Sequence, residues 1–244
     1  MSKPILAAVA LAALASLGAS APVYAEEAAP AASPLSFNAS LTTDYRYRGI
    51  SQTRLKPALQ GGADYDFGNG FYIGTWASTI KWIKDGGGDG NVEIDLYGGY
   101  KTEISKGLTL DVGLLQYVYP SNALNPSANT LEIYGALTFG VFTAKYSHST
   151  SNLFGFADSK GSGYLDLSAA IDLGDGMTLT PHIGHQSVRH SGEYSYTDYS
   201  LTLNKDYAGF LWGVSAVGTS TDAYQGVGKN LGKSALVLSV KKTF

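Results

Sequence analysis

The stretch Val92-Glu93-Ile94-Asp95-Leu96-Tyr97 shows the pattern that decides the fold. Apolar and polar side chains alternate residue by residue here, and a β-strand sends successive side chains to opposite faces of its sheet. The same alternation recurs over residues 37–48, 131–139, 165–172 and 236–244. After residue 34 we find no segment with the periodicity of an amphipathic helix. We therefore predict an all-β chain.

Glycines that close tight turns recur every 33 to 37 residues, each directly before an apolar or aromatic residue: Gly70, Gly107, Gly140, Gly176 and Gly209. Longer polar links alternate with these turns, at residues 49–57, 81–91, 120–128, 150–162, 189–195 and 219–233. Short turns at one end and long loops at the other are typical of outer-membrane barrels. The spacing predicts a transmembrane, antiparallel, up-and-down β-barrel of about twelve strands, with short periplasmic turns and longer extracellular loops.

The two ends of the chain carry export signals. Lys3 precedes an apolar run over residues 5–17, and Val23-Tyr24-Ala25 has the small residues that a signal peptidase reads. We predict a signal peptide at 1–25 with cleavage after Ala25, a flexible segment at 26–34 and the barrel at 35–244. The apolar run is shorter than the ~20 residues of a spanning helix. The terminal Phe244 resembles the signal for insertion by the barrel-assembly machinery, so the predicted location is the outer membrane of a Gram-negative bacterium.

The composition excludes several classes of protein. Only 15% of the residues are charged, well below the ~25% of soluble domains. The absence of cysteine excludes a disulfide scaffold, a thiolate metal site and a cysteine nucleophile. The net charge of -3 argues against nucleic-acid binding. The glycine-rich stretch 85–91 lacks the ligand spacing of a calcium loop. We predict no cofactor and no metal.

Two early motifs resemble a known family. Residues 45–53 read Tyr-Arg-Tyr-Arg-Gly-Ile-Ser-Gln-Thr, and Pro57-Ala58-Leu59-Gln60-Gly61-Gly62 follows them. Together with residues 71–78 and 93–100, these motifs resemble the TorF porin family over the first third of the mature chain. The resemblance implies an exported bacterial protein that acts as an outer-membrane channel. Arg54 and Lys56 depart from it, because they make the first loop basic where acidic residues are expected.

Charged residues on the polar faces of the strands fall at similar heights in the outer half of the predicted lumen. Because burying unpaired charge is costly, they must line water or pair across the interior. One interpretation is a constriction that filters small solutes by charge and size, with a weak cation preference; the other is a salt-bridge network that plugs the barrel. The size of a twelve-strand barrel favours the narrow channel. The predicted pore-lining residues are Asp44, Arg46, Arg48, Glu93, Asp95, Glu132, Lys145, Asp166 and Asp198.

Aromatic side chains on the apolar faces are expected at the two membrane interfaces; stacking on a ligand is the alternative. The strand at residues 71–80 could face either way. The long loops carry more basic than acidic residues, which favours contact with the phosphates of lipopolysaccharide or serves solubility alone. The predicted interface aromatics are Tyr45 and Tyr47 at the loop end, and Phe67, Phe71, Phe139, Phe142, Phe210, Trp212 and Phe244 near the short turns.

These observations favour a channel for passive diffusion of small hydrophilic solutes, embedded in outer-membrane lipid and lipopolysaccharide, and not an enzyme. A second hypothesis is a non-conducting structural or adhesive barrel whose loops bind partners. A third is a lipid hydrolase at the outer rim, for which His148-Ser149 and His190-Ser191 are the candidate pairs. No acidic residue that could orient either histidine is evident from the sequence.

Overall fold

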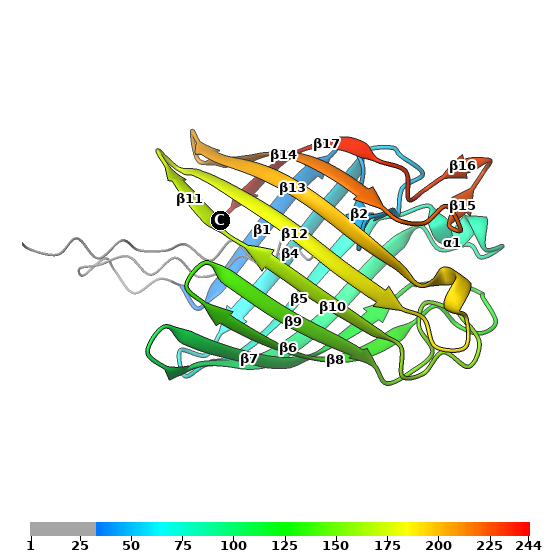
Figure 1. The fold of residues 1–244 in the computed structure, drawn as a ribbon, viewed down its shortest axis with the longest axis horizontal. Helices are drawn as coiled ribbons and strands as arrows, with labels where there is room; N and C mark the ends of the chain where they lie inside the picture. The colour runs from blue at the N-terminus through cyan, green and yellow to red at the C-terminus, as the bar shows by residue number, and fades with distance from the viewer. Residues whose placement is uncertain (1–32) are drawn as a thin grey trace, which may run out of the picture.

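The computed structural model describes residues 33–244, so the predicted signal peptide and most of the segment 26–34 lie outside the described residues. One antiparallel sheet dominates the described chain (Figure 1). Its strands are β1 (Leu35–Thr42), β4 (Ala58–Asp66), β5 (Phe71–Thr79), β6 (Val92–Ser105), β7 (Leu108–Val118), β8 (Thr130–Phe139), β9 (Phe142–Ser149), β10 (Gly163–Ala169), β11 (Ile171–Gly174), β12 (Met177–Ser187), β13 (Tyr196–Tyr207), β14 (Phe210–Thr219) and β17 (Ala235–Thr243).

The sheet closes on itself. Each strand pairs with its neighbours in sequence, and β1 pairs with β17 to complete the circle. Strands β10 and β11 both pair with β12, so they form one strand interrupted at Ala170. The barrel therefore has twelve strands. Backbone bonds between Phe37 and Phe244, with N···O distances of 2.8 and 3.2 Å, join the first strand to the last residue. The predicted closed, all-β barrel is confirmed.

Connections differ sharply between the two ends of the barrel. At the left in Figure 1, which we call the short-turn end, hairpins such as Asp175–Gly176 join the strands, with positive φ at both turn residues as a type I′ turn requires. At the right, the loop end, long connections carry the remaining short elements. These are β2 (Arg46–Tyr47), β3 (Ile50–Ser51), α1 (Trp82–Asp85), η1 (Gly192–Tyr194), β15 (Gln225–Gly226) and β16 (Lys229–Asn230). Within residues 33–244, no helix is both long and apolar enough for a membrane span.

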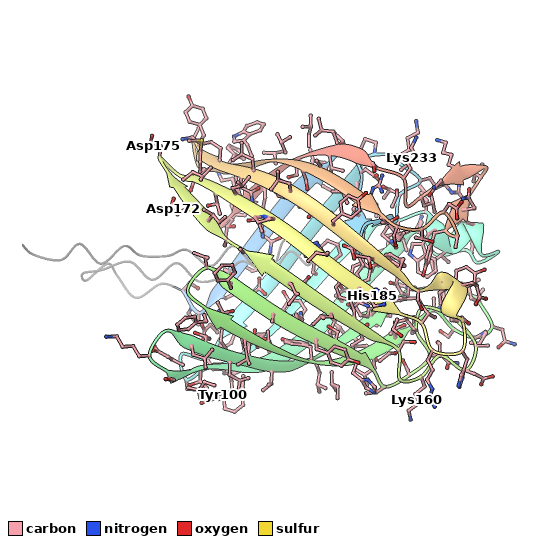
Figure 2. All side chains as sticks on the ribbon, viewed as in Figure 1. Tyr100, Lys160, Asp172, Asp175, His185 and Lys233 are labelled. Atoms are coloured by element: carbon pink, nitrogen blue, oxygen red, sulfur yellow. The ribbon has the colours of Figure 1, made fainter. Side chains whose placement is uncertain are left out.

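Side chains on the outer wall are apolar and exposed. Leu59, Leu114, Ile183 and Leu238 are examples from four different strands, and Figure 2 shows Tyr100 directed away from the wall. A protein in water buries such residues. The barrel thus presents an apolar exterior over its middle, which is the inverse of a water-soluble domain.

The strand β5 shows which way its two faces point. Phe71 and Ile73 are exposed on the outer wall, whereas Tyr72 donates to Asp111 of β7 and Trp76 is buried inside the barrel. The structure therefore settles the orientation of the strand at residues 71–80, which the sequence left open. Seven of the predicted interface aromatics lie exposed at or near the short-turn end: Phe67, Phe71, Phe139, Phe142, Phe210, Trp212 and Phe244. Their contact with a membrane interface stays a prediction.

Candidate functional site

The first long connection, residues 43–57, folds into the barrel; we call it the inward segment. After Thr42 the chain leaves the wall, and β2 and β3 pair only with each other. Arg48 and Gly49 have φ values of 46° and 78°, so a type I′ turn forms the tip of this hairpin. A Cβ on Gly49 would lie 2.5 Å from Thr219 Cγ2 and 2.7 Å from Asp198 Cβ. The tip therefore presses against the wall at β13 and β14, and only glycine fits there.

Arg48 anchors the tip to several strands. Its Nη2 lies 2.7 Å from Oε2 of Glu132 on β8, and its Nη1 donates to Oε1 of Gln186 on β12 at 2.6 Å. The guanidinium also lies 4.3 Å from the ring centroid of Tyr164, and the Arg48 carbonyl accepts a hydrogen bond from the Tyr196 hydroxyl. Burial opposes the charged form, but the Glu132 carboxylate outweighs it and raises the pKa of Arg48 above its usual value. Arg48 is therefore a fixed positive charge in the lumen.

A second ion pair stiffens the inward segment itself. Arg46 Nε lies 2.6 Å from Oδ2 of Asp44, and Oδ1 of the same carboxylate accepts hydrogen bonds from Ser51 and Thr53. Arg46 Nη1 donates to the backbone carbonyls of Gly49, Leu231 and Lys233. The hairpin is thereby tied to the last long loop as well as to the barrel wall.

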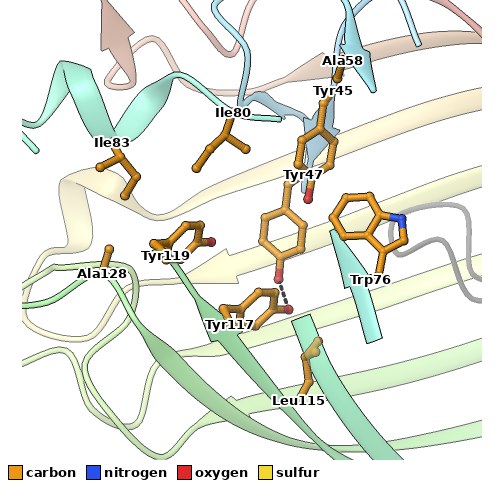
Figure 3. Packing of buried hydrophobic residues seen from close by; sticks show 10 residues of the cluster. All are labelled: Tyr45, Tyr47, Ala58, Trp76, Ile80, Ile83, Leu115, Tyr117, Tyr119 and Ala128. Atoms are coloured by element: carbon orange, nitrogen blue, oxygen red, sulfur yellow. Dashed lines mark hydrogen bonds between the residues drawn. The ribbon is translucent and has the colours of Figure 1, made fainter. Parts of the chain in front are cut away.

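Tyr45 and Tyr47 are not interface aromatics, and that prediction is wrong. Their side chains are only 4% and 8% exposed, and Figure 3 shows them inside the barrel beside Trp76 and Tyr117. The Tyr47 and Tyr117 hydroxyls are 2.5 Å apart, and the rings of Tyr45 and Trp76 are 5.3 Å apart. The strand alternation does not apply to them because the wall strand ends at Thr42, before either tyrosine.

Two carboxylates of β6 face this aromatic cluster. Glu93 accepts a hydrogen bond from the Tyr45 hydroxyl at 2.7 Å. Asp95 is fully buried, at 0% exposure, and neither of its oxygens has a hydrogen-bond partner within the described residues. An unpaired buried carboxylate is expensive, and such groups in native proteins call for an explanation. The inward segment therefore covers an unpartnered, buried carboxyl group in the outer half of the lumen.

Three further predicted residues, Asp166, Asp198 and Lys145, make contacts on the inner face of the wall. His182 Nε2 lies 3.1 Å from Oδ2 of Asp166, and its Nδ1 lies 3.6 Å from Oδ2 of Asp198. The Lys145 ammonium lies 4.1 Å from the ring centroid of Tyr134. The His182 and Asp166 side chains, both 15% exposed, are less completely enclosed than Arg48 and Glu132, whereas the Asp198 side chain is 3% exposed. The walls around the tip of the inward segment thus carry paired polar side chains.

Some lumenal pairs were missed by the sequence analysis. Tyr97 donates to Asp64, and Tyr72 donates to Asp111 at 2.7 Å. Tyr97 has the same strand parity as Glu93 and Asp95, so the alternation itself was the signal that could have found it. Lys241 likewise faces inward on β17, opposite Ser40 of β1.

The nine predicted pore-lining residues fall into two groups. Asp44, Arg46 and Arg48 lie inside the barrel, but on the inward segment and not on a wall strand. Glu93, Asp95, Glu132, Lys145, Asp166 and Asp198 face inward from the walls. The structure brings Arg48 and Glu132 into direct contact and leaves Asp95 without a partner. That these residues line a conducting path stays a prediction.

The histidines are not arranged as a hydrolytic site. His148 and Ser149 are adjacent on β9 and point to opposite faces, with Ser149 fully buried and bonded to the Ser151 carbonyl. His190 Nδ1 is bonded to the backbone carbonyl of Asp158. Asp85, from the glycine-rich stretch, pairs with Arg54 at 2.6 Å. Across residues 33–244, no group of three metal-ligating side chains comes together.

Comparison with solved structures defines the class of fold. The chain superposes on KdgM porin with a TM-score of 0.56 at 9% identity, over 86% of this chain and 99% of that one. The match to NanC porin has a TM-score of 0.55 at 10% identity, over 86% and 98% of the two chains. A second KdgM structure, in complex with disordered oligogalacturonate, gives 0.55 at 8% identity over 86% and 98%. The chain has the twelve-strand barrel fold of these porins.

The family is defined by sequence. Residues 26–244 match the model of a family described as "Bacterial protein of unknown function (Gcw_chp)", and the chain belongs to that family. The match begins directly after Ala25, the predicted cleavage position, which itself stays a prediction. No curated protein matches the sequence.

Proposed function

We propose that this protein is an outer-membrane channel of the porin type, through which small hydrophilic solutes or ions diffuse passively. The single observation that carries the proposal is the polarity of the closed barrel: apolar side chains cover its exterior while charged side chains face its interior. Lipid is the environment in which this arrangement is stable. The similarity to KdgM and NanC supports the proposal, as does the resemblance to the TorF porin family.

The inward segment sets the narrowest part of the proposed path. Around its tip the lumen is filled by buried side chains, with Arg48 and Glu132 at 6% and 2% exposure. Conduction at useful rates therefore requires the segment to shift or to leave the lumen, so we propose that it acts as a gate over the charged constriction. With the segment withdrawn, the path is lined mainly by carboxylates, which gives the weak cation preference that the sequence predicts.

The proposed setting follows from the same polarity. The protein lies in the outer membrane of a Gram-negative bacterium, with the short turns in the periplasm and the long loops outside, in contact with lipid and lipopolysaccharide. Its insertion requires the barrel-assembly machinery, which reads the terminal Phe244. The mechanism is diffusion through a polar lumen and needs no covalent chemistry.

Conductance across a planar lipid bilayer tests the proposal. The purified full-length mature barrel should produce discrete openings. In a salt gradient, its reversal potential should shift toward the equilibrium potential of the cation. Silence at all voltages and salt concentrations would exclude a channel. The alternative, a non-conducting barrel whose loops bind partners, is favoured by one observation, the direct Arg48–Glu132 ion pair across the lumen, and silence would support it.

A further inference from the structure

A cavity at the loop end gathers a large share of the positive charge in the loops. It has a volume of about 290 Å³ and lies between three connections: the return arm of the inward segment, the loop after β5 and the loop that carries β15 and β16. Arg54, Lys56, Lys81 and Lys229 line it. The long loops hold eight basic residues in all, so half of them converge on this one cavity.

Most of this charge is uncompensated. Arg54 is neutralised by Asp85, with Nη2 2.6 Å from Oδ1 and Nε 3.0 Å from Oδ2. Within the described chain, the ammonium groups of Lys56, Lys81 and Lys229 make no ion pair with a carboxylate. Three positive charges around a small concave site produce a focused positive potential. The cavity is thus built to attract a compact anion.

The charge and the size indicate which anion. A phosphate group carries close to two negative charges at neutral pH and three acceptor oxygens, which matches three free ammonium groups better than a single carboxylate does. Lysine binds phosphate as a point charge, and a planar guanidinium is not required for this. A volume of about 290 Å³ lies near the lower limit of small-molecule sites, enough for a phosphate and part of the group that carries it.

We propose that this cavity binds a phosphate group at the outer mouth of the barrel. The phosphate is either free, as inorganic phosphate or a small phosphate monoester, or is the headgroup phosphate of a neighbouring lipid. Thr53 and Lys56 belong to the return arm of the inward segment, so the bound group contacts the base of that segment directly. Binding does not depend on conduction, and the two proposals fail separately.

Titration calorimetry of the folded full-length mature barrel in detergent tests the site. The free probe is inorganic phosphate, and the lipid probes are vesicles of phosphatidylcholine that contain either lipid A or dephosphorylated lipid A. We expect saturable binding of inorganic phosphate, of the lipid A vesicles, or of both, and none to the dephosphorylated vesicles. Which phosphate probe binds identifies the source of the phosphate.

A matched pair of variants separates a site from general attraction. K56A/K81A/K229A removes the three free lysines of the cavity, and K84A/K160A/K233A removes the same charge from loop lysines that do not line it. We expect the first to weaken phosphate binding at least about tenfold, because local contacts are lost, and the second less than about twofold, because distant exposed charges are screened. The single variant K81A tests the same cavity with the loss of only one charge.

Two results would overturn the proposal. If the two triple variants weakened phosphate binding equally, the binding would reflect only the overall charge of the loops and not a site. Absence of saturable binding to either phosphate probe would remove the site altogether. In both cases the conductance measurement stays independent, because neither variant changes a residue of the lumen.

Discussion

The Arg48 guanidinium and the Glu132 carboxylate lie 2.7 Å apart across the interior of the barrel, although 84 positions separate them in the sequence. One belongs to the tip of the inward segment and the other to the wall strand β8. Both are buried, so neither charge is satisfied by bulk water. This ion pair is one of several direct links between the segment and the wall, beside the Arg48–Gln186 and Tyr45–Glu93 hydrogen bonds.

Removing one member of the pair should open the lumen and destabilise the barrel. Arg48→Ala leaves the buried Glu132 carboxylate without its positively charged partner and with only the Tyr117 hydroxyl bonded to it, which costs about 3–5 kcal/mol. We expect a lower unfolding midpoint in denaturant, and more frequent or larger openings in planar bilayers than for the unchanged protein.

The double variant R48M/E132M is the control for that experiment. It removes both charges and keeps apolar volume, so stability should largely recover, while the anchor to β8 is still absent and openings stay frequent. Equal conductance in all three proteins would show that the segment does not close the path.

Gly49 provides an independent way to disturb the tip. In Gly49→Ala the new methyl group would meet Thr219 and Asp198 at the wall, in addition to the strain of a positive φ. Gly140→Ala is the matched change, because φ is +57° there and no atom lies within 4 Å of the added Cβ. We expect a loss of about 1–2 kcal/mol for Gly140→Ala and a larger loss, with altered conductance, for Gly49→Ala. Indistinguishable denaturation curves for the two variants would mean that the wall side chains move to accommodate the methyl group added at Gly49.

Most of the wall could be predicted from the sequence, and the inward segment could not. Alternation defines a wall strand because one side meets an apolar medium and the other a polar lumen, as in β6. The same alternation continues through Tyr45 and Arg48, yet those residues have left the wall. Their pattern reflects a small hairpin in which Arg48-Gly49 forms the turn, and no local feature separates it from a continuing strand. Which charges pair, as Arg48 does with Glu132, depends on distances across the barrel that periodicity does not contain.

Asp95 should destabilise the barrel as it stands. Both carboxylate oxygens are buried without a partner in the described chain, and an unsatisfied buried polar group costs about 1–3 kcal/mol. We therefore expect Asp95→Leu to raise the free energy of unfolding by a similar amount. Asp111→Leu should lower it, because Asp111 accepts a hydrogen bond from Tyr72. Equilibrium denaturation of both variants in detergent is the measurement, and a destabilised Asp95→Leu protein would indicate an unseen partner for this carboxylate.

Alkaline pH should unfold the barrel through its buried tyrosines. Burial, followed by the nearby charges of Glu93 and Asp95, raises the pKa of Tyr45 well above its ordinary value, and the pKa of Tyr119 is raised for the same reasons. A folded state with raised phenol pKa values binds protons that the unfolded state has released, so stability is complete below about pH 10 and falls as the pH rises further.

Absorbance at the phenolate wavelength tests this expectation. The buried Tyr45 and Tyr119 should ionise only as circular dichroism shows loss of the strands. In the double variant Y45F/Y119F, the free energy of unfolding should fall less steeply as the pH rises above about 10. A single titration of all tyrosines near pH 10, with the barrel still folded, would contradict the enclosed packing of these two rings.

Substitution of Phe244 distinguishes an effect on the assembly of the barrel from an effect on its stability. Its ring is 68% exposed, while its backbone N–H and C=O bond to Phe37. Phe244→Ala keeps these backbone bonds and removes a ring that contacts little, so the refolded protein should unfold at the same denaturant concentration within about 0.5 kcal/mol. In cells, however, the assembly machinery should insert this variant several-fold less efficiently if it reads the terminal aromatic ring. Phe142→Ala, at 66% exposure near the same end, should leave both measurements unchanged. Equal membrane yields for the two variants would assign Phe244 no role in insertion beyond closing the sheet through its backbone.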